Sequence, residues 1–359
     1  MREIIIATLF IVMSGFIAIE LGMSAAIIEV VAGILAKEVI SFESTEVIDL
    51  LANIGIITLM YVAGLEIDID LLKQNIKPAF TIGSVSFALP FISVFLASLY
   101  LLGMNQQQSL ITGIALSATS IPMIYSIMKT AGFSIARKRL ILSVAMINDI
   151  LSMAFLSIFF SGISILLIGL VLGLFIFAYT FPMFGKRVFR RFKGNVVEFE
   201  FKAILLLLLG VAVISEHVGV EAALIAFILG MITSEVVVKH ETLAMKLNGI
   251  VFGFFAPIFF FKVGLAIGLS DILGNLVSLT VLLLAAFISR YLGIYLGGRM
   301  YAKKKASFVA ALLNSRISLG IIAALLGYEM GIISDGIYSA IIGAIIVSSI
   351  LSSVLCKRH

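Results

Sequence analysis

The sequence predicts an all-α polytopic membrane protein with about 13 transmembrane helices. Of its 359 residues, 62% are hydrophobic and only 13% are charged, and the mean hydropathy is +1.22. Apolar runs of helix length recur from end to end, separated by short polar or glycine-containing breaks. Soluble domains do not have this composition, whereas polytopic membrane proteins do.

The expected helices follow directly from these apolar runs. They are residues 3–20, 24–39, 47–66, 78–101, 108–128, 139–161, 163–184, 199–217, 219–235, 247–268, 275–299, 306–328 and 333–355. Several, such as 24–39 and 219–235, are shorter than the ~20 residues of a full crossing. We expect tilted, interfacial or broken helices at those places.

The basic residues indicate the orientation, because Lys and Arg gather in cytoplasmic loops. With the N-terminus outside, 20 of the 25 fall on the inner side. These are Lys73, Lys77, Lys129, Arg137, Lys138, Arg139, Lys186, Arg187, Arg190, Arg191, Lys193, Lys202, Lys239, Lys246, Arg299, Lys303, Lys304, Lys305, Lys357 and Arg358. Only Arg2 and Lys37 fall outside. The sequence therefore predicts a protein of the cell membrane with its N-terminus outside and its C-terminus in the cytoplasm.

Other classes of function are disfavoured. The single cysteine, Cys356, and three scattered histidines provide neither disulfides nor a transition-metal centre, and no cofactor is expected. The net charge of +5 reflects cytoplasmic loops rather than a nucleic-acid partner. The first apolar run lacks a cleavage site and is expected to be a retained helix. We expect no soluble regulatory domain after the last apolar segment.

Asp149 is the most informative residue, because it lies deep in the apolar run 140–160 with Asn148 before it. A charged carboxylate near the bilayer centre costs about 3 kcal/mol or more, so such an acid is a functional candidate. Burial favours the protonated form of a carboxyl group, while a nearby cation favours the ionised form. A proton and a cation would then compete for one carboxylate, which is the minimum machinery of exchange. The alternative is a structural aspartate bonded to a neighbouring helix.

Two apolar segments carry polar interruptions, at residues 117–122 (SATSIP) and 314–318 (NSRIS). A basic stretch at 185–200 separates the two halves of the chain. Paired interruptions at corresponding places in two halves point to a midplane site between inverted repeats. Proline clashes with the carbonyl four residues earlier, so Pro122 predicts that the first helix opens at Ala118. Freed carbonyls and the hydroxyls of Thr119 and Ser120 are oxygen ligands for a monovalent cation, unless these hydroxyls only bond back to their own kinked helix.

Three basic residues lie within apolar segments. Arg290 and Arg316 remain charged, so each needs a partner or a helix C-terminus. They could neutralise the ends of broken helices, form structural ion pairs, or do both. Lys262 could extend to the interface, pair with an acid such as Glu29, or release a proton in the cycle. Glu29 itself is either a cavity acid or the partner of a buried base.

Six motifs in order resemble the monovalent cation:proton antiporters, in particular their Kef/Nap-like second family. They are IIEVVAGILAKEV with Glu29 and Gly33, YVAGLEIDI, ALSATSIPMI, MINDIL, APIFFFKVGL and ISRYLGIYLGGR. The resemblance covers essentially the whole chain. The chain departs from the family pattern at Lys262, where a charge is unusual. It departs again at residues 316–318, where RIS replaces an R-G-E motif.

The resemblance implies a mobile core domain with two crossed broken helices, including about 78–161 and 247–328, beside a panel domain that forms a homodimer. It implies that Asp149 carries cation and proton, with Asn148, Thr119 and Ser120 beside it. Asn148-Asp149 with Arg290 resembles the electroneutral pattern, which implies one cation for one proton.

The first hypothesis is therefore a sodium/proton antiporter of the elevator type, with lithium or potassium as alternative cations. A second hypothesis keeps the fold but makes the protein a non-exchanging cation channel or sensor. A third is a sodium-coupled organic-anion symporter, in which Arg316 or Lys262 binds the anion.

Overall fold

In a computed structural model of the chain, every regular element of the described part is helical. Residues 2–121, 133–161, 198–218, 222–238, 240–299, 306–317 and 319–357 are described, with isolated residues between 121 and 133 and between 161 and 198. Within them, seven helices are long and apolar enough to cross a membrane. The predicted segment 163–184 falls mostly outside the described residues. The count of thirteen crossings stays a prediction.

The chain divides into two compact units, which we describe separately. The first comprises Met1–Ser44, Leu71–Leu156 and Phe260–His359; the second comprises Thr45–Asp70 and Ser157–Phe259. Three helices run across these limits: α4 (Ile69–Gln74), α8 (Ile135–Ser161) and α13 (Ala256–Leu265).

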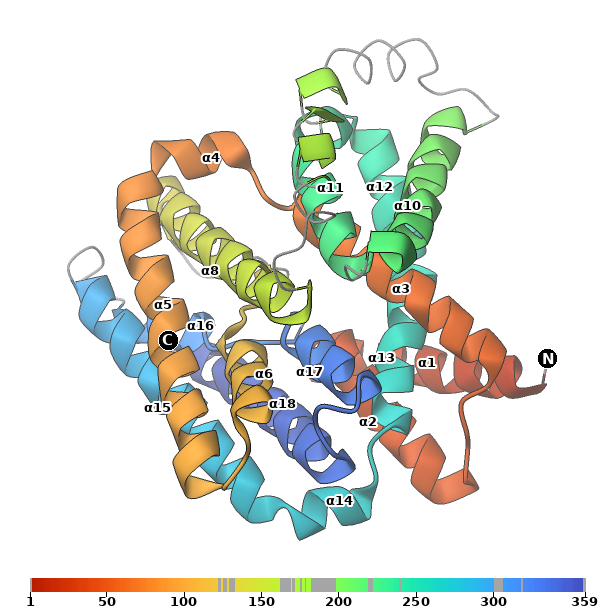
Figure 1. Cartoon of the computed structure of the whole chain (residues 1–359), viewed down its shortest axis with the longest axis vertical. Coiled ribbons are helices and arrows are strands. Elements are labelled where there is room, and N and C mark those ends of the chain that lie inside the picture. Colours follow the sequence, from red (N-terminus) through yellow and green to blue (C-terminus); the bar gives the residue numbers. More distant parts are fainter. Residues whose placement is uncertain are drawn as a thin grey trace. The chain divides into compact units, whose positions relative to one another are not determined.

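The first unit contains most of the helices. They are α1 (Arg2–Leu21), α2 (Ala25–Ile40), α5 (Ile76–Leu96), α6 (Gln106–Ser117), α14 (Leu269–Gly274), α15 (Leu276–Arg299), α16 (Ala306–Leu312), α17 (Leu319–Glu329) and α18 (Asp335–Lys357). α5 packs against both α6 and α15, as Figure 1 shows, and α18 packs against α15, α16 and α17. α6 begins with a capping box in which Gln108 N donates to Asn105 Oδ1 at 2.9 Å and Asn105 N donates to Gln108 Oε1 at 3.1 Å. These bonds fix where the helix that carries the first interruption starts.

In the same unit, α2 and α13 cross with their backbones in contact. A side chain at Gly33 would overlap Phe261 O and would lie 2.9 Å from Gly264 Cα. A side chain at Gly264 would likewise overlap Val30 O. Glycine is therefore required at both positions for this crossing, as at other close helix contacts in membranes.

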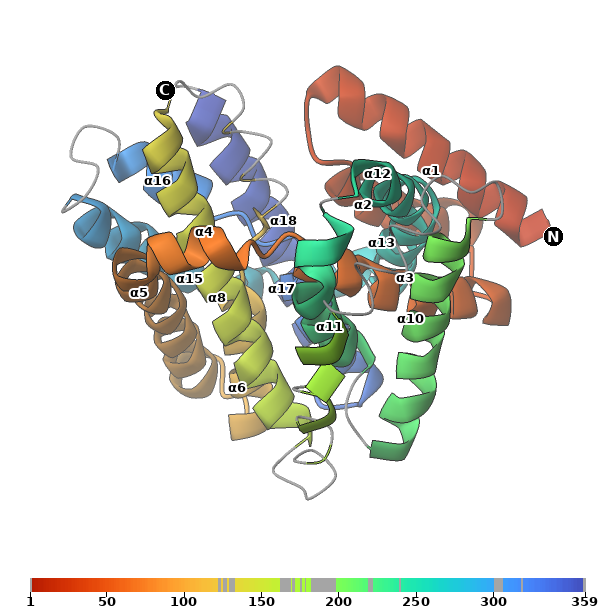
Figure 2. The same cartoon turned by 90° about the horizontal axis from the view of Figure 1, so that it is seen from above.

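The second unit contains α3 (Glu46–Leu65), α10 (Phe199–Val218), α11 (Ala222–Val237) and α12 (Glu241–Ile250). α3 and α11 cross in close contact (Figure 2). A side chain at Gly64 would overlap Phe227 O and lie 2.9 Å from Gly230 Cα. Near this crossing the hydroxyls of Tyr61 and Thr233 are hydrogen-bonded at 2.9 Å. The two hydroxyls between these apolar helices thus satisfy each other, as a lipid environment requires.

One local arrangement occurs twice along the chain. The six-residue helices α4 and α14 begin 200 residues apart, at residues 69 and 269, and each is followed by a long helix. Asn75 Nδ2 donates to Leu71 O at 3.2 Å, and Asn275 Nδ2 donates to Asp271 O at 2.9 Å. The same residue type therefore makes the same turn after both short helices. The sequence analysis did not predict α4 or α14, because each has barely more than one turn.

Candidate functional site

The first predicted interruption is a break in the helix. α6 ends at Ser117, and Ala118 is extended with φ −63° and ψ 164°. Thr119 and Ser120, which follow, are buried. The helix thus opens at the residue that the sequence analysis predicted. Pro122, on which that prediction rested, lies outside the described residues.

Asn148 connects this break to two other helices. Thr119 Oγ1 donates to Asn148 Oδ1 at 2.5 Å. Asn148 Nδ2 in turn donates to Ser86 Oγ at 3.3 Å. Ser86 lies on α5 and Asn148 on α8, so this pair of bonds ties both helices to the end of α6. The Asn148 amide oxygen thus accepts its hydrogen bond from Thr119 in this structure.

Asp149 is the next residue on α8, with 4% of its surface exposed. Its carboxylate is near enough to the Arg290 guanidinium for their opposite charges to interact. A carboxylate therefore lies within electrostatic reach of a buried arginine, one residue along α8 from Asn148.

Arg290, on α15, is fully buried, and among the described residues its hydrogen bonds go to backbone carbonyls. Its Nη2 donates to Ser117 O, and its Nη1 donates to Ala118 O at 2.6 Å and to Leu313 O at 3.2 Å. Its Nε donates to Ser86 O at 3.2 Å. Ser117 and Ala118 end α6, and Leu313 follows the end of α16, so one guanidinium meets the negative ends of two half-helices. The carbonyls that were expected to face a cation at the first break thus bind the protein's own arginine.

The second predicted interruption is also a break. α16 ends at Leu312 and α17 begins at Leu319, with Arg316 fully buried between them. Arg316 Nη2 donates to Ala286 O at 2.8 Å and to Asn314 Oδ1 at 2.7 Å. The partners of Arg316 are therefore a carbonyl and an amide, and Ser318 lies outside the described residues.

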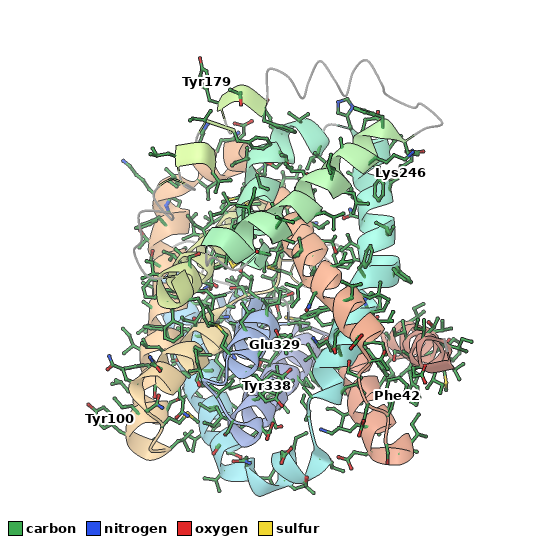
Figure 3. The ribbon with its side chains drawn as sticks, turned by 45° about the vertical axis from the view of Figure 1, so that its right-hand side comes forward. Phe42, Tyr100, Tyr179, Lys246, Glu329 and Tyr338 are labelled. Carbon is green, nitrogen blue, oxygen red and sulfur yellow. The ribbon has the colours of Figure 1, made fainter. Side chains whose placement is uncertain are left out.

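Lys262 belongs to a different cluster. Its Nζ lies 3.1 Å from Glu329 Oε1, at the end of α17. Figure 3 shows Glu329 near Tyr338, whose hydroxyl donates to Val263 O at 3.3 Å. The acid that pairs with Lys262 is thus Glu329 and not Glu29, which was considered from the sequence. Glu29 is buried on α2 and makes no side-chain hydrogen bond or ion pair within the described part of the chain.

Sequence reasoning missed several of these partners. Ser86 gave no signal because it is one of many small hydroxyl residues in apolar helices. The carbonyls of Leu313 and Ala286 are backbone groups, so no residue type marks them. Glu329 did carry a signal, since it is an acid at the end of an apolar segment, as Lys262 is a base near the end of another.

Comparisons with known proteins show the family of this chain. The family model described as "Sodium/hydrogen exchanger, transmembrane" matches residues 4–357. The probable Na(+)/H(+) antiporter GerT of Bacillus cereus is 26% identical over 284 residues, covering 75% of this chain and 74% of that protein. The probable Na(+)/H(+) antiporter 3 of Methanocaldococcus jannaschii is 28% identical over 242 residues, covering 63% of this chain and 61% of that protein.

A solved structure supports the fold. The sodium proton antiporter MjNhaP1 from Methanocaldococcus jannaschii superposes with a TM-score of 0.75 at 18% identity, covering 100% of this chain and 98% of that one. At that identity the likeness concerns the fold alone. The family match spans nearly the whole sequence, both helix breaks included. The chain therefore belongs to the transmembrane sodium/hydrogen exchangers, a family of membrane transporters.

Proposed function

We propose that the protein exchanges a monovalent cation, sodium in the first place, for a proton, with Asp149 as the shared site. The observation that carries the proposal is the buried Asp149 carboxylate beside a break whose half-helix ends are held by Arg290. A cation at Asp149 would find hydroxyl oxygens on Thr119 and Ser120. These are hard ligands of the kind that sodium, lithium and potassium accept. A protonated Asp149 cannot bind the cation at the same time, so proton binding and cation binding alternate.

The stoichiometry that we propose is one cation for one proton. Asn148 beside Asp149 does not titrate, and Arg290 stays charged while bound to four carbonyls. Lys262, considered from the sequence as a second proton carrier, lies in an ion pair with Glu329. Among the described residues at the breaks, Asp149 is thus the group whose charge changes in the proposed cycle. Exchange of one positive charge for another moves no net charge, so it would serve pH homeostasis without depending on voltage.

For the architecture, we propose thirteen crossings, an outside N-terminus, inverted repeats and a homodimer. The recurrence of α4 and α14 with their matching asparagine turns supports two related halves. In this proposal a core that includes about 78–161 and 247–328 carries the site across the membrane like an elevator. Cross-linking of paired single cysteines, introduced after Cys356 is replaced, would test the homodimer.

Reconstituted vesicles provide the test of function. Sodium, lithium or potassium is added outside vesicles that enclose a pH-sensitive dye, with and without a voltage clamp. We expect cation-driven proton movement that Asp149→Asn abolishes and that the clamp does not change. The matched control is Asp70→Asn, the same substitution at an exposed residue of α4, which should retain activity. Turnover that generates a voltage would contradict the one-for-one stoichiometry, and activity in Asp149→Asn would contradict the site.

A further inference from the structure

Arg316 is the buried charge that the proposed exchange does not use. A guanidinium has five N–H donors and no acceptor. The two hydrogens on Nη2 serve Ala286 O and Asn314 Oδ1. The donors on Nε and Nη1 are buried and have no acceptor within the described residues. Three of the five N–H groups are thus without a partner among the described residues, on a side chain with 0% solvent exposure.

Such donors need a partner, because buried polar groups in native proteins are almost always hydrogen-bonded to protein, water or an ion. The partners that Arg316 does have are a carbonyl and an amide, so neither neutralises its charge. A buried charge that is not compensated is among the most costly features a fold can carry. The missing partner should therefore be an acceptor, and a negatively charged one satisfies both requirements.

The charges around the breaks point the same way. Arg290 is close enough to Arg316 for their like charges to repel. Asp149, the acid that interacts with Arg290, loses its negative charge whenever it binds a proton, and a bound cation neutralises it. With either the proton or the cation bound, Asp149 would then no longer offset the positive charge of the two arginines. A permanent negative charge next to Arg316 would compensate one of these two positive charges in every state.

The groups next to Arg316 include further donors. Arg316 N donates to Ser349 Oγ at 3.3 Å, and this hydroxyl retains a hydrogen of its own to donate. Leu319 begins α17, whose first N–H groups lack intrahelical acceptors and form the positive end of the helix dipole. N–H and O–H groups beside a buried guanidinium suit a small anion rather than a large organic one.

We propose that the second break binds a small inorganic anion of the halide type, chloride in the first place, at Nε or Nη1 of Arg316. The anion acts as a resident counter-ion of the two arginines and is not a transported substrate. This site goes beyond the proposed exchange, and its tests measure binding, so they do not depend on whether the protein exchanges sodium for protons.

Bromide is the probe, because its anomalous scattering locates it in a crystal. The full chain is purified in sodium gluconate, and bromide or chloride then replaces gluconate at constant sodium and constant ionic strength. We expect an anomalous peak beside the Arg316 guanidinium. We also expect a rise of the thermal midpoint that saturates with halide, since a ligand that binds only the folded protein stabilises it by mass action. A thiol-reactive dye reports unfolding, because Cys356 is the single cysteine and is buried.

Two variants separate the site from general salt effects. Arg316→Gln should remove the saturating halide response, while Lys246→Gln, which loses an exposed ion pair with Glu198, should retain it. If Arg316→Gln does not fold, the bromide map and the halide titration of the unaltered protein decide alone. The proposal is overturned if saturating bromide gives no peak beside Arg316, or if both variants respond equally. It is also overturned if labelled acetate displaces bromide and is carried across vesicle membranes, since the site would then bind an organic substrate.

Discussion

Arg290 allows the sharpest test of how the site is held together. Its guanidinium makes four hydrogen bonds to buried carbonyls on three segments: α5, the end of α6 and the end of α16. Hydrogen bonds to a charged group contribute about 1.5–3 kcal/mol each. Losing all four in Arg290→Met would therefore cost roughly 6–12 kcal/mol, which is comparable to the whole stability of a typical domain. We expect this variant not to accumulate in a folded state.

Arg290→Lys is the informative variant, because it keeps the charge. A lysine offers three donors from a single nitrogen, so at least one of the four carbonyls loses its partner. Each lost bond should cost about 1.5–3 kcal/mol, or a factor of roughly 10 to 150 in the ratio of folded to unfolded protein. The measurement is the rate at which a thiol-reactive dye labels Cys356 during heating or denaturant titration, compared with the unaltered chain.

Lys246→Met is the control for these variants. Its ion pair with Glu198 is 2.6 Å long, but both side chains are almost half exposed. Exposed pairs typically contribute only about 0–1 kcal/mol, so its labelling should stay close to that of the unaltered protein. If Arg290→Met were as stable as Lys246→Met, the carbonyl bonds would not hold the half-helices and our account of the breaks would be wrong.

Two further predictions concern packing and cation binding. Gly64→Ala should destabilise the second unit, because the new methyl group would overlap Phe227 O. By contrast, the methyl group added by Gly210→Ala in α10 would have no neighbour within 4 Å, so this variant should be neutral or stabilised by about 0.5–1 kcal/mol. The thermal midpoints of the two variants measure the difference. Thr119→Val removes the hydrogen bond to Asn148 Oδ1 and a proposed oxygen ligand of the cation. The KM for the cation should therefore rise, while the amount of protein expressed should change little. Thr119→Ser should stay near the original KM, and equal KM values for both would exclude a role for this hydroxyl.

The sequence predicted the helices and both breaks well, for identifiable reasons. Helix limits follow hydropathy, because the polar residues at the end of a membrane crossing reach water. The predicted segment 275–299, for example, differs from α15 by one residue. The breaks were found because a proline, or a run of polar residues, cannot continue an apolar helix without cost. Ala118 and Arg316 both lie in the predicted interruptions and outside the helices.

The partners of the buried charges could not be predicted in the same way. Arg290 binds carbonyls, which every residue possesses, so only the crossing geometry shows which ones are near. Lys262 pairs with Glu329, 67 residues away in the chain, across a contact between α13 and α17. Hydropathy reports the depth of a residue in the membrane but not its neighbours on other helices. The tertiary structure is therefore needed to assign these ion pairs.

The nature of these hydrogen-bond partners affects how many protons can be exchanged for each cation. If the arginines were neutralised by carboxylates, each such acid would be a further group able to take up a proton near the cation site. The carbonyl and amide oxygens that bind Arg290 and Arg316 belong to neutral groups. They stabilise the positive charges through their dipoles and do not take up a proton. In the proposed exchange, Asp149 would then be the group at the breaks that takes up and releases the proton. A halide at Arg316 would preserve the same property, since chloride does not take up a proton at any physiological pH. Hydrogen-bond partners that do not titrate are thus what the proposed exchange of one proton for one cation requires of these two arginines.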